Sequence, residues 1–201
     1  MRKLLNIFYN FHWIVPGEAA RASQSYLGML APFLKANAIR AVINLRGRHP
    51  KFAWWAYETG VCAREGVAHF DAMMDSRSLP LRAMLVALID AFEAAPRPFV
   101  VKCSGGQDRT SFAAALYIVH RDGWDALDRA QQQFRVLPFL HFPRAHQRWL
   151  KAFLPLAREL AGGRPLAQWI RESYDPEDFS RRLAPGTFHA IWEPWKPKPK
   201  P

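Results

Sequence analysis

The feature that most constrains the fold is an alternation of short apolar, β-branched runs with longer runs that have helical spacing. Three of the apolar runs are expected to be buried strands, at 39–47, 67–73 and 98–103. Helices are expected at 25–38, 51–66, 78–95, 110–123, 124–136 and 143–163. Because crossover helices join parallel strands, the pattern predicts an α/β fold, with a central, mostly parallel sheet of about four to five strands flanked by helices.

Two local signals refine this prediction. The segment 11–23 contains Pro16-Gly17, a turn signal, and is expected to form a short hairpin or two extended pieces. Ser78 is expected to cap the helix over 78–95, with Pro80 in its first turn.

The domain organisation follows from length and from a change in composition. The chain has 201 residues, enough for one domain with its own core, which is expected over residues 1–162. After Gly162-Gly163 the composition changes, and residues 163–201 are expected to form a C-terminal extension. Its Lys/Pro-rich end, EPWKPKPKP, is expected to be an extended, mobile tail, a solvated end rather than a membrane or partner tether.

The charge predicts an anionic partner. The net charge is +11, which suits a phosphorylated substrate, an acidic lipid surface or a nucleic acid. The arginines are scattered and no nucleic-acid motif is present, so no nucleic acid is expected. A weak contact with an acidic membrane surface stays open.

The two cysteines, Cys62 and Cys103, form no disulfide framework and fit a reducing compartment. The start, MRKLLNIFYNFHWIVPG, has an interrupted apolar part and no small-residue cleavage site, so it is expected to belong to the fold. No apolar run reaches the length of a membrane span, and a cytoplasmic location is expected. No Cys/His cluster has zinc spacing, so no metal is expected.

The stretch VVKCSGGQDRTSF, residues 100–112, carries the clearest chemical signal. Cys103 ends a predicted strand, residues 104–108 form a glycine-containing loop, and Arg109 and Thr110 open a helix. The N–H groups at a helix N-terminus bind anions, and an arginine fork holds two phosphate oxygens. A thiol beside these groups is expected to be a thiolate at neutral pH, so the loop predicts nucleophilic attack on a phosphate ester.

C-x5-R-[ST] between a strand and a helix resembles the signature of the cysteine-dependent protein tyrosine and dual-specificity phosphatases. The segment 10–24 is similar to the entry segment of compact bacterial and fungal dual-specificity members, where V-x-x-G-x-x-x-R-S-x-Q is common. The segment 27–47 resembles their next helix and strand, and the likeness covers about residues 10–154. The resemblance implies a protein tyrosine phosphatase-like fold and a phosphomonoester hydrolase that uses no cofactor.

The resemblance also implies roles for residues of the loop. Cys103 would be the nucleophile that forms a phosphocysteine, Arg109 would bind the phosphate and stabilise the transition state, and the Thr110 hydroxyl would assist the thiolate. The phosphate would be cradled by the backbone of Ser104, Gly105, Gly106, Gln107, Asp108 and Arg109. Asp108 is expected to orient the loop, face the substrate or be solvated.

The general acid is expected on the loop after the second strand. HFDAMMDSRSLP offers Asp71 and Asp75. Asp75 is favoured, because Asp71 falls within the predicted strand.

Two departures from the family pattern keep other functions open. Lys102 stands where the family usually has histidine, and Ser111 where it usually has glycine. They motivate an alternative, a catalytically silent phosphate-binding (pseudophosphatase) module. A third hypothesis is a redox protein that pairs Cys103 with Cys62, although packing is the favoured role of Cys62.

Other residues have weaker signals. Substrate contact is an open role for Arg46. The glutamines 131–133 are expected on a helix surface rather than positioning water, and the aromatic residues are expected in the core rather than on a recognition platform. Rim and packing roles are equally open for the next group. These aromatic and rim residues are Trp54, Trp55, Trp149, His141, Arg144 and His146. Phosphotyrosine proteins, phosphoinositide-like head groups and sugar phosphates all remain candidate substrates.

Overall fold

The computed structural model describes residues 2–26 and 28–193. Its centre is a five-stranded sheet in the order β1-β2-β6-β3-β4. The strands are β1 (His12–Val15), β2 (Ala19–Ala22), β3 (Ala41–Asn44), β4 (Ala68–Asp71) and β6 (Phe99–Lys102). β1 pairs antiparallel with β2, and the other pairings are parallel. The predicted α/β fold with a mostly parallel sheet is confirmed.

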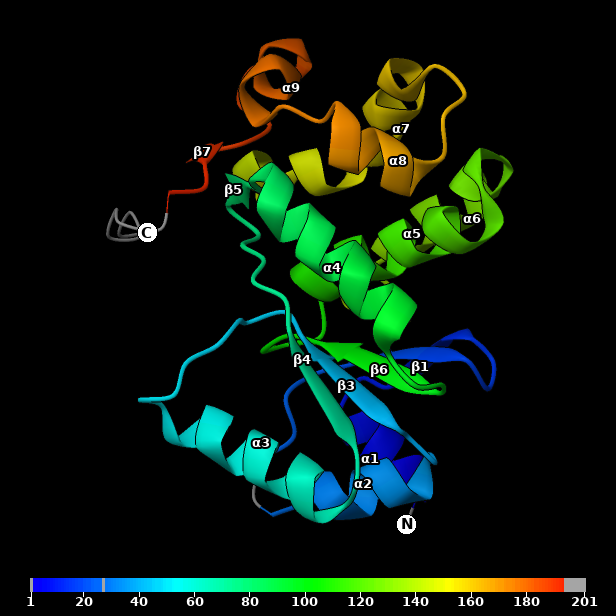
Figure 1. Cartoon of the computed structure of the whole chain (residues 1–201), viewed down its shortest axis with the longest axis vertical. Coiled ribbons are helices and arrows are strands. Elements are labelled where there is room, and N and C mark those ends of the chain that lie inside the picture. The colour runs from blue at the N-terminus through cyan, green and yellow to red at the C-terminus, as the bar shows by residue number, and fades with distance from the viewer. Residues whose placement is uncertain (1, 27, 194–201) are drawn as a thin grey trace.

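Helices cover both faces of the sheet (Figure 1). One face carries α1 (Arg2–Phe8), α2 (Leu30–Ala36) and α3 (Ala53–Arg64). The opposite side carries α4 (Arg82–Ala94), α5 (Asp108–Asp122), α6 (Leu127–Gln131), α7 (Trp149–Ala161), α8 (Leu166–Glu172) and α9 (Pro176–Arg182). Short 3-10 turns lie at Trp124–Ala126, Gln132–Phe134 and Ala145–Gln147.

Each face of the sheet has its own apolar core. The smaller core packs α1 to α3 on the sheet and includes Phe33, Val42 and Cys62. The larger core is centred on α5, whose alanine-rich run is fully buried, and includes Cys103. The two cysteines therefore belong to cores on opposite faces of the sheet, and both are free thiols. This separation argues against their pairing as a disulfide.

The region around residue 78 differs from the sequence prediction. Ser78 does not cap a helix: it lies in β5 (Ser78–Leu79), which pairs with β7 (Ala190–Ile191) in a separate two-stranded sheet. Leu81 is extended, and α4 begins only at Arg82. The pairing with a strand more than a hundred residues away overrides the local capping signal. The hairpin predicted over 11–23 is confirmed as β1 and β2.

The C-terminal extension continues the larger core as far as it is described. Trp169 of α8, Tyr174 and Phe179 of α9 are buried, and their rings surround Phe153 of α7. The boundary at residue 162 stays a prediction. Most of the predicted Lys/Pro-rich tail, residues 194–201, lies outside the described residues. Within the described residues, none of the helices combines the length and apolarity that a membrane crossing requires.

Candidate active site

The loop between β6 and α5 forms the floor of a small open pocket of about 190 Å³. The pocket is lined by Ser76, Cys103, Ser104, Gly105, Gln107, Asp108 and Arg109. Since β6 lies between β2 and β3, the cysteine follows the central strand at its carboxyl end, where open α/β sheets bind ligands. Its side chain is buried at the base of the loop, with only 3% of its surface exposed.

The surroundings of Cys103 favour the thiolate. Burial raises the pKa of the thiol, but the charge of Arg109, the Thr110 hydroxyl and the N–H groups of Gln107 and Gly106 more than offset it, and the net pKa is lowered. Oγ1 of Thr110 is buried and has no other hydrogen-bond partner among the described residues. The sulfur is therefore held as an anion by groups that would also hold phosphate oxygens.

Arg109 is anchored at both ends of its guanidinium. Its Nη2 donates to Oγ of Ser104 at 3.1 Å, and its Nη1 lies 3.5 Å from the carbonyl of Met74. The side chain is only half-buried. These contacts hold the fork against the pocket that contains the thiol.

The segment 10–24 supports the loop from below. Gly106 has φ +66°, and a Cβ there would lie 2.7 Å from the backbone nitrogen of Ser23. The Gln24 N–H donates to the Ser104 carbonyl at 3.1 Å, and Asn10 Nδ2 donates to the Gly106 carbonyl at 3.2 Å. Glycine is required at 106 because the loop rests directly on the backbone of the entry segment.

Sequence reasoning gave no role to Arg21, which is fully buried under the loop. Its Nη2 donates to the Gly106 carbonyl at 3.0 Å and to Oγ of Ser111 at 2.8 Å. Its Nη1 donates to the carbonyl and to Oε1 of Gln133. Burial lowers the pKa of this guanidinium to about 9, while the Cys103 thiolate opposes that change. Ser111 therefore fills the glycine position with a hydroxyl that binds Arg21.

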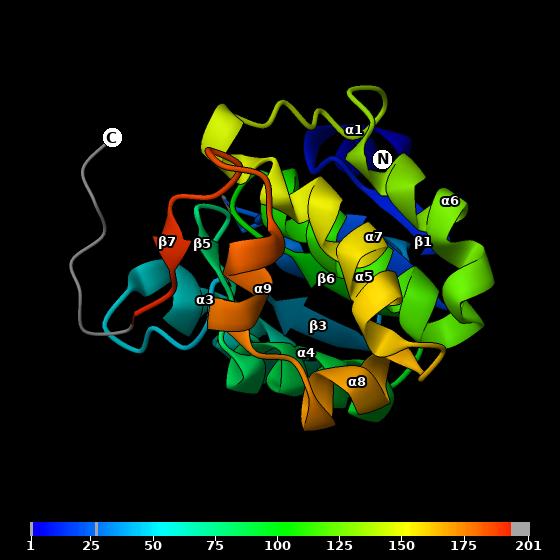
Figure 2. The ribbon, with the colours of Figure 1, turned by 90° about the horizontal axis from the view of Figure 1, so that it is seen from above.

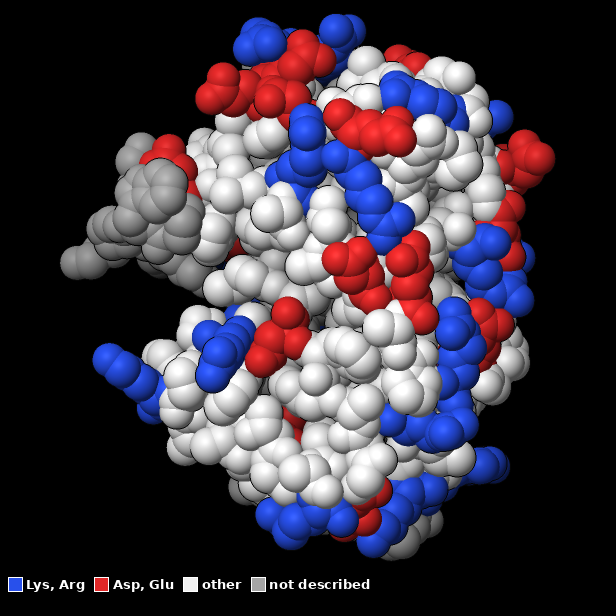
Figure 3. Space-filling view, viewed as in Figure 1, with Lys and Arg blue, Asp and Glu red and all other residues white. Residues whose placement is uncertain are grey.

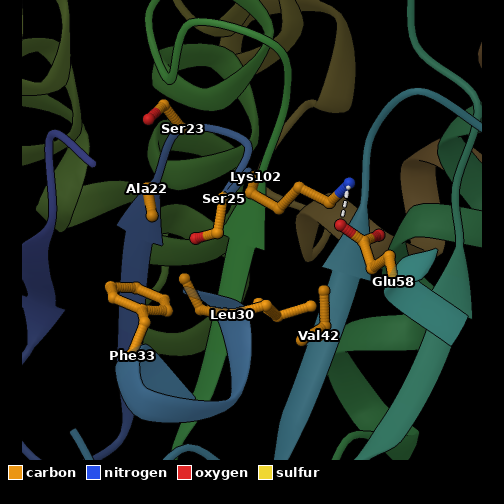
Figure 4. Close-up of a pocket in the computed structure, with 9 residues that line it drawn as sticks. Ala22, Ser23, Ser25, Leu30, Phe33, Val42, Glu58 and Lys102 are labelled. Atoms are coloured by element: carbon orange, nitrogen blue, oxygen red, sulfur yellow. Dashed lines mark ion pairs between the residues drawn. The ribbon is translucent and has the colours of Figure 1, made fainter. Parts of the chain in front are cut away.

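Lys102 belongs to a second buried network (Figure 4). Its Nζ lies 2.6 Å from Oε2 of Glu58 on α3 and donates to Oε1 of Gln24 at 2.8 Å. His69 lies 2.9 Å from the other Glu58 oxygen. Burial lowers the Lys102 pKa to about 8, although Glu58 opposes the shift. The lysine thus connects β6 to α3 and the entry segment.

The two carboxylates predicted as general acids are both engaged in hydrogen bonds outside the pocket lining. Asp71 accepts from Asn44 Nδ2 at 2.7 Å and from Trp55 Nε1 at 3.0 Å. Asp75 accepts from the Arg77 N–H and the Ser78 hydroxyl, each at 3.3 Å. Asp75 precedes Ser76, a lining residue, whereas Asp71 is tied into the sheet edge.

Asp108 is the carboxylate among the lining residues of this pocket. Its Oδ1 lies 3.2 Å from Nδ1 of His141, a side chain that is only 2% exposed. Its Oδ2 accepts from Gln147 Nε2 at 3.1 Å, and the same nitrogen donates to Oγ of Ser76. Asp108 thus ties the loop to the segment that follows α6.

The remaining candidates are placed as follows. Arg46 lies over the Trp54 ring at 3.5 Å and donates to Gln24. Gln133 holds Arg21, whereas Trp149 is fully buried in the core. Burial raises the pKa of Cys62 to about 12, which leaves it an unreactive packing residue. Trp54 and Trp55 are half-buried, Arg144 is exposed, and His146 contacts the ring of His189.

No metal site is evident in residues 2–26 and 28–193, where no three His, Cys, Asp or Glu side chains come together as ligands.

The comparisons with known proteins agree with this geometry at the level of the fold. No protein-family model matches the chain, and no curated protein matches its sequence. A crystal structure of P. aeruginosa TpbA is 17% identical and covers 82% of this chain and 89% of that chain, with a TM-score of 0.56. A mutant form of Tk-PTP is 15% identical, covers 75% and 97%, and has a TM-score of 0.58.

A third neighbour is PTPMT1 in complex with PI(5)P, which is 17% identical, covers 75% of this chain and 98% of that chain, and has a TM-score of 0.53. These neighbours are phosphatases of the tyrosine and dual-specificity type. The chain has the dual-specificity/tyrosine phosphatase-like fold that its sequence resemblance predicts.

Proposed function

We propose that the protein is a cysteine-dependent phosphatase that hydrolyses a phosphate monoester through a phosphocysteine on Cys103. The observation that carries the proposal is the buried thiol of lowered pKa beneath a loop of N–H donors and Arg109. A thiolate, an oxyanion cradle and a cationic fork around one centre are what phosphoryl transfer to sulfur requires.

Two displacements complete the proposed reaction. The Cys103 thiolate attacks phosphorus, the bond between phosphorus and the leaving oxygen breaks, and that oxygen takes a proton. Water then attacks the phosphocysteine, the sulfur–phosphorus bond breaks, and inorganic phosphate leaves. Arg109 stabilises the charge on the equatorial oxygens, and the Thr110 hydroxyl stabilises the departing thiolate.

The proton donor is proposed from the carboxylates near the pocket. Asp75 is the first candidate, because it adjoins the lining residue Ser76 and its two hydrogen bonds are long. Asp108 is the second, because it lines the pocket. The donor's Asn variant should slow hydrolysis of an alkyl phosphate much more than that of para-nitrophenyl phosphate, whose leaving group needs no proton. Asp71→Asn is the matched control.

Substrate class is proposed from the pocket and the neighbours. The titles of two neighbours name complexes of TpbA with pTyr and of PTPMT1 with PI(5)P. A phosphorylated protein, a lipid head group or a small phosphate ester would each present the same phosphomonoester to the Cys103 loop. A reducing compartment such as the cytoplasm would keep this thiol active.

The first experiment is hydrolysis of para-nitrophenyl phosphate in EDTA, from about pH 5 to about pH 8, by wild type and Cys103→Ser. We expect turnover that the substitution abolishes. Absence of turnover by wild type with reduced Cys103 would contradict the proposal and favour a phosphate-binding pseudophosphatase. That second candidate is motivated by Lys102, which is held by Glu58 and Gln24 and does not contact the thiol in place of the usual histidine.

A further inference from the structure

Two segments place large apolar side chains in solvent. Helix α1 exposes Leu4, Ile7 and Phe8, which share one helix face by their spacing while Leu5 is buried beneath them. Their exposed fractions are 69%, 77% and 84%. The segment 136–142 exposes Val136, Leu137, Leu140 and Phe142, by 47%, 73%, 40% and 64%. We call these seven side chains the apolar rim.

The two halves of the apolar rim form one surface. Ile7 and Leu140 line the same open depression, together with Asn10 and Pro138. Asn10 Nδ2 donates to the Phe139 carbonyl at 3.3 Å. Figure 2 shows α1 and the loop after α6 on the same side of the molecule. A contiguous exposed apolar patch on a folded protein marks an interaction site.

The apolar rim is connected directly to the candidate active site. The same Asn10 nitrogen donates to the Gly106 carbonyl in the loop that follows Cys103. Arg21, which holds that carbonyl, also lies 4.1 Å beneath the Phe139 ring. His141 reaches Asp108 from within the rim segment. A surface that docks on the rim would therefore lie at the mouth of the pocket.

The segments that carry the apolar rim contain cations and no acids. Residues 1–17 and 129–158 have no Asp or Glu. They hold Arg2, Lys3, Arg129, Arg135, Arg144, Arg148, Lys151 and Arg158. Arg2, Lys3 and Arg135 are exposed and make no ion pair with any described residue. The face that carries α4 and α8 differs, because it mixes both signs, with Arg171 between Asp90 and Glu93 (Figure 3).

We infer that the apolar rim and its cations dock on an anionic lipid bilayer, so that the pocket acts on a lipid phosphomonoester at that surface. Exposed apolar side chains enter the interface, while lysine and arginine beside them bind the anionic head groups. A second copy of this chain is disfavoured as the occupant, because a symmetric contact would bring the same cations together without acids. The substrate part of this inference rests on the proposed phosphatase function; the docking part does not.

The test of docking is cosedimentation of the full chain with vesicles of phosphatidylcholine alone or of phosphatidylcholine with phosphatidylglycerol. We expect binding only to the anionic vesicles, with an affinity that falls as salt rises. Phe8→Ser and Leu137→Ser should each weaken binding by about tenfold, because each removes a side chain that would be buried in the interface. Arg135→Gln should weaken it by about fivefold.

Phe52→Ser is the matched control, since Phe52 is 56% exposed at the start of α3, away from the rim segments. It should bind like wild type. Equal binding to both vesicle types, no binding, or an equal loss in the control would overturn the inference. So would a concentration-dependent dimer, seen by sedimentation velocity, that Phe8→Ser abolishes.

Activity separates the two proposals. Phe8→Ser and Leu137→Ser should hydrolyse para-nitrophenyl phosphate as wild type does, yet lose about tenfold on a lipid phosphomonoester presented in anionic vesicles. An unchanged rate on the vesicle substrate would overturn the lipid assignment. Absence of turnover by wild type on both substrates, with vesicle binding intact, would contradict the phosphatase function and leave the docking surface standing.

Discussion

At the scale of the residue, Cys103 is distinguished from Cys62 by its surroundings. The lowered pKa of Cys103 places its thiolate at a lower pH than an ordinary thiol, whereas burial raises the pKa of Cys62 to about 12. We predict that iodoacetate modifies Cys103 alone in the native protein at neutral pH. Arg109→Met should move the midpoint of the rate–pH profile up by about one unit or more, because an adjacent cation favours the thiolate. Peptide mapping after timed alkylation measures both; a midpoint that stays in place would argue against Arg109 as the cause.

Glu58 is the residue on which the second buried network depends. Glu58→Gln should lower the free energy of unfolding by about 3–5 kcal/mol at neutral pH, because Lys102 would lose its buried counter-charge. The variant Glu58→Leu/Lys102→Met, which removes both charges, should recover part of that loss. Urea denaturation followed by tryptophan fluorescence measures each value.

The same carboxylate predicts a pH dependence of stability. Burial raises the pKa of Glu58, but His69 and Lys102 more than offset this effect, and the folded pKa is lowered. The unfolded state therefore binds the proton first, so this stabilisation is present above about pH 5 and is lost on further acidification. Wild type should lose stability on acidification more steeply than Glu58→Gln; parallel slopes would contradict the assignment.

At the scale of the element, the loop between β6 and α5 depends on one of its two glycines far more than on the other. Gly106→Ala should abolish turnover and lower the urea midpoint, because its Cβ would meet the backbone of Ala22 and Ser23 and its φ is positive. Gly105→Ala is the control, since its Cβ would meet only the Gln107 side chain, at 3.6 Å. A Gly106→Ala variant as stable and active as Gly105→Ala would contradict this packing.

Local patterns predicted the elements with strong periodicity and missed those that depend on distant partners. The strands at 41–44, 68–71 and 99–102 have β-branched runs that identify them. β5 is two residues long and exists through its pairing with β7, so no local signal announces it. The loop motif likewise identified Cys103 and Arg109. Arg21 was missed as a support, because its partner Gln133 lies 112 residues away.

At the scale of the whole molecule, the C-terminal extension shares the larger core. Phe179→Ala should lower the free energy of unfolding by about 3 kcal/mol, because it empties a fully buried site against Phe153. We expect one cooperative transition by fluorescence and by circular dichroism. Glu172→Ala, an exposed change on α8, is the control. Two separate transitions would show that residues 163–193 unfold as an independent unit.

The pairing of β6 on both edges has a consequence for hydrogen exchange. β2 and β3 both bond to this strand, so its amides have no solvent-exposed edge from which to open. They should exchange with deuterium only when the entire chain unfolds, more slowly than amides of the edge strands β1 and β4. Cys103 directly follows this strand. Loss of the thiol's surroundings should therefore coincide with global unfolding, and the protein should keep its site intact for as long as it keeps its fold.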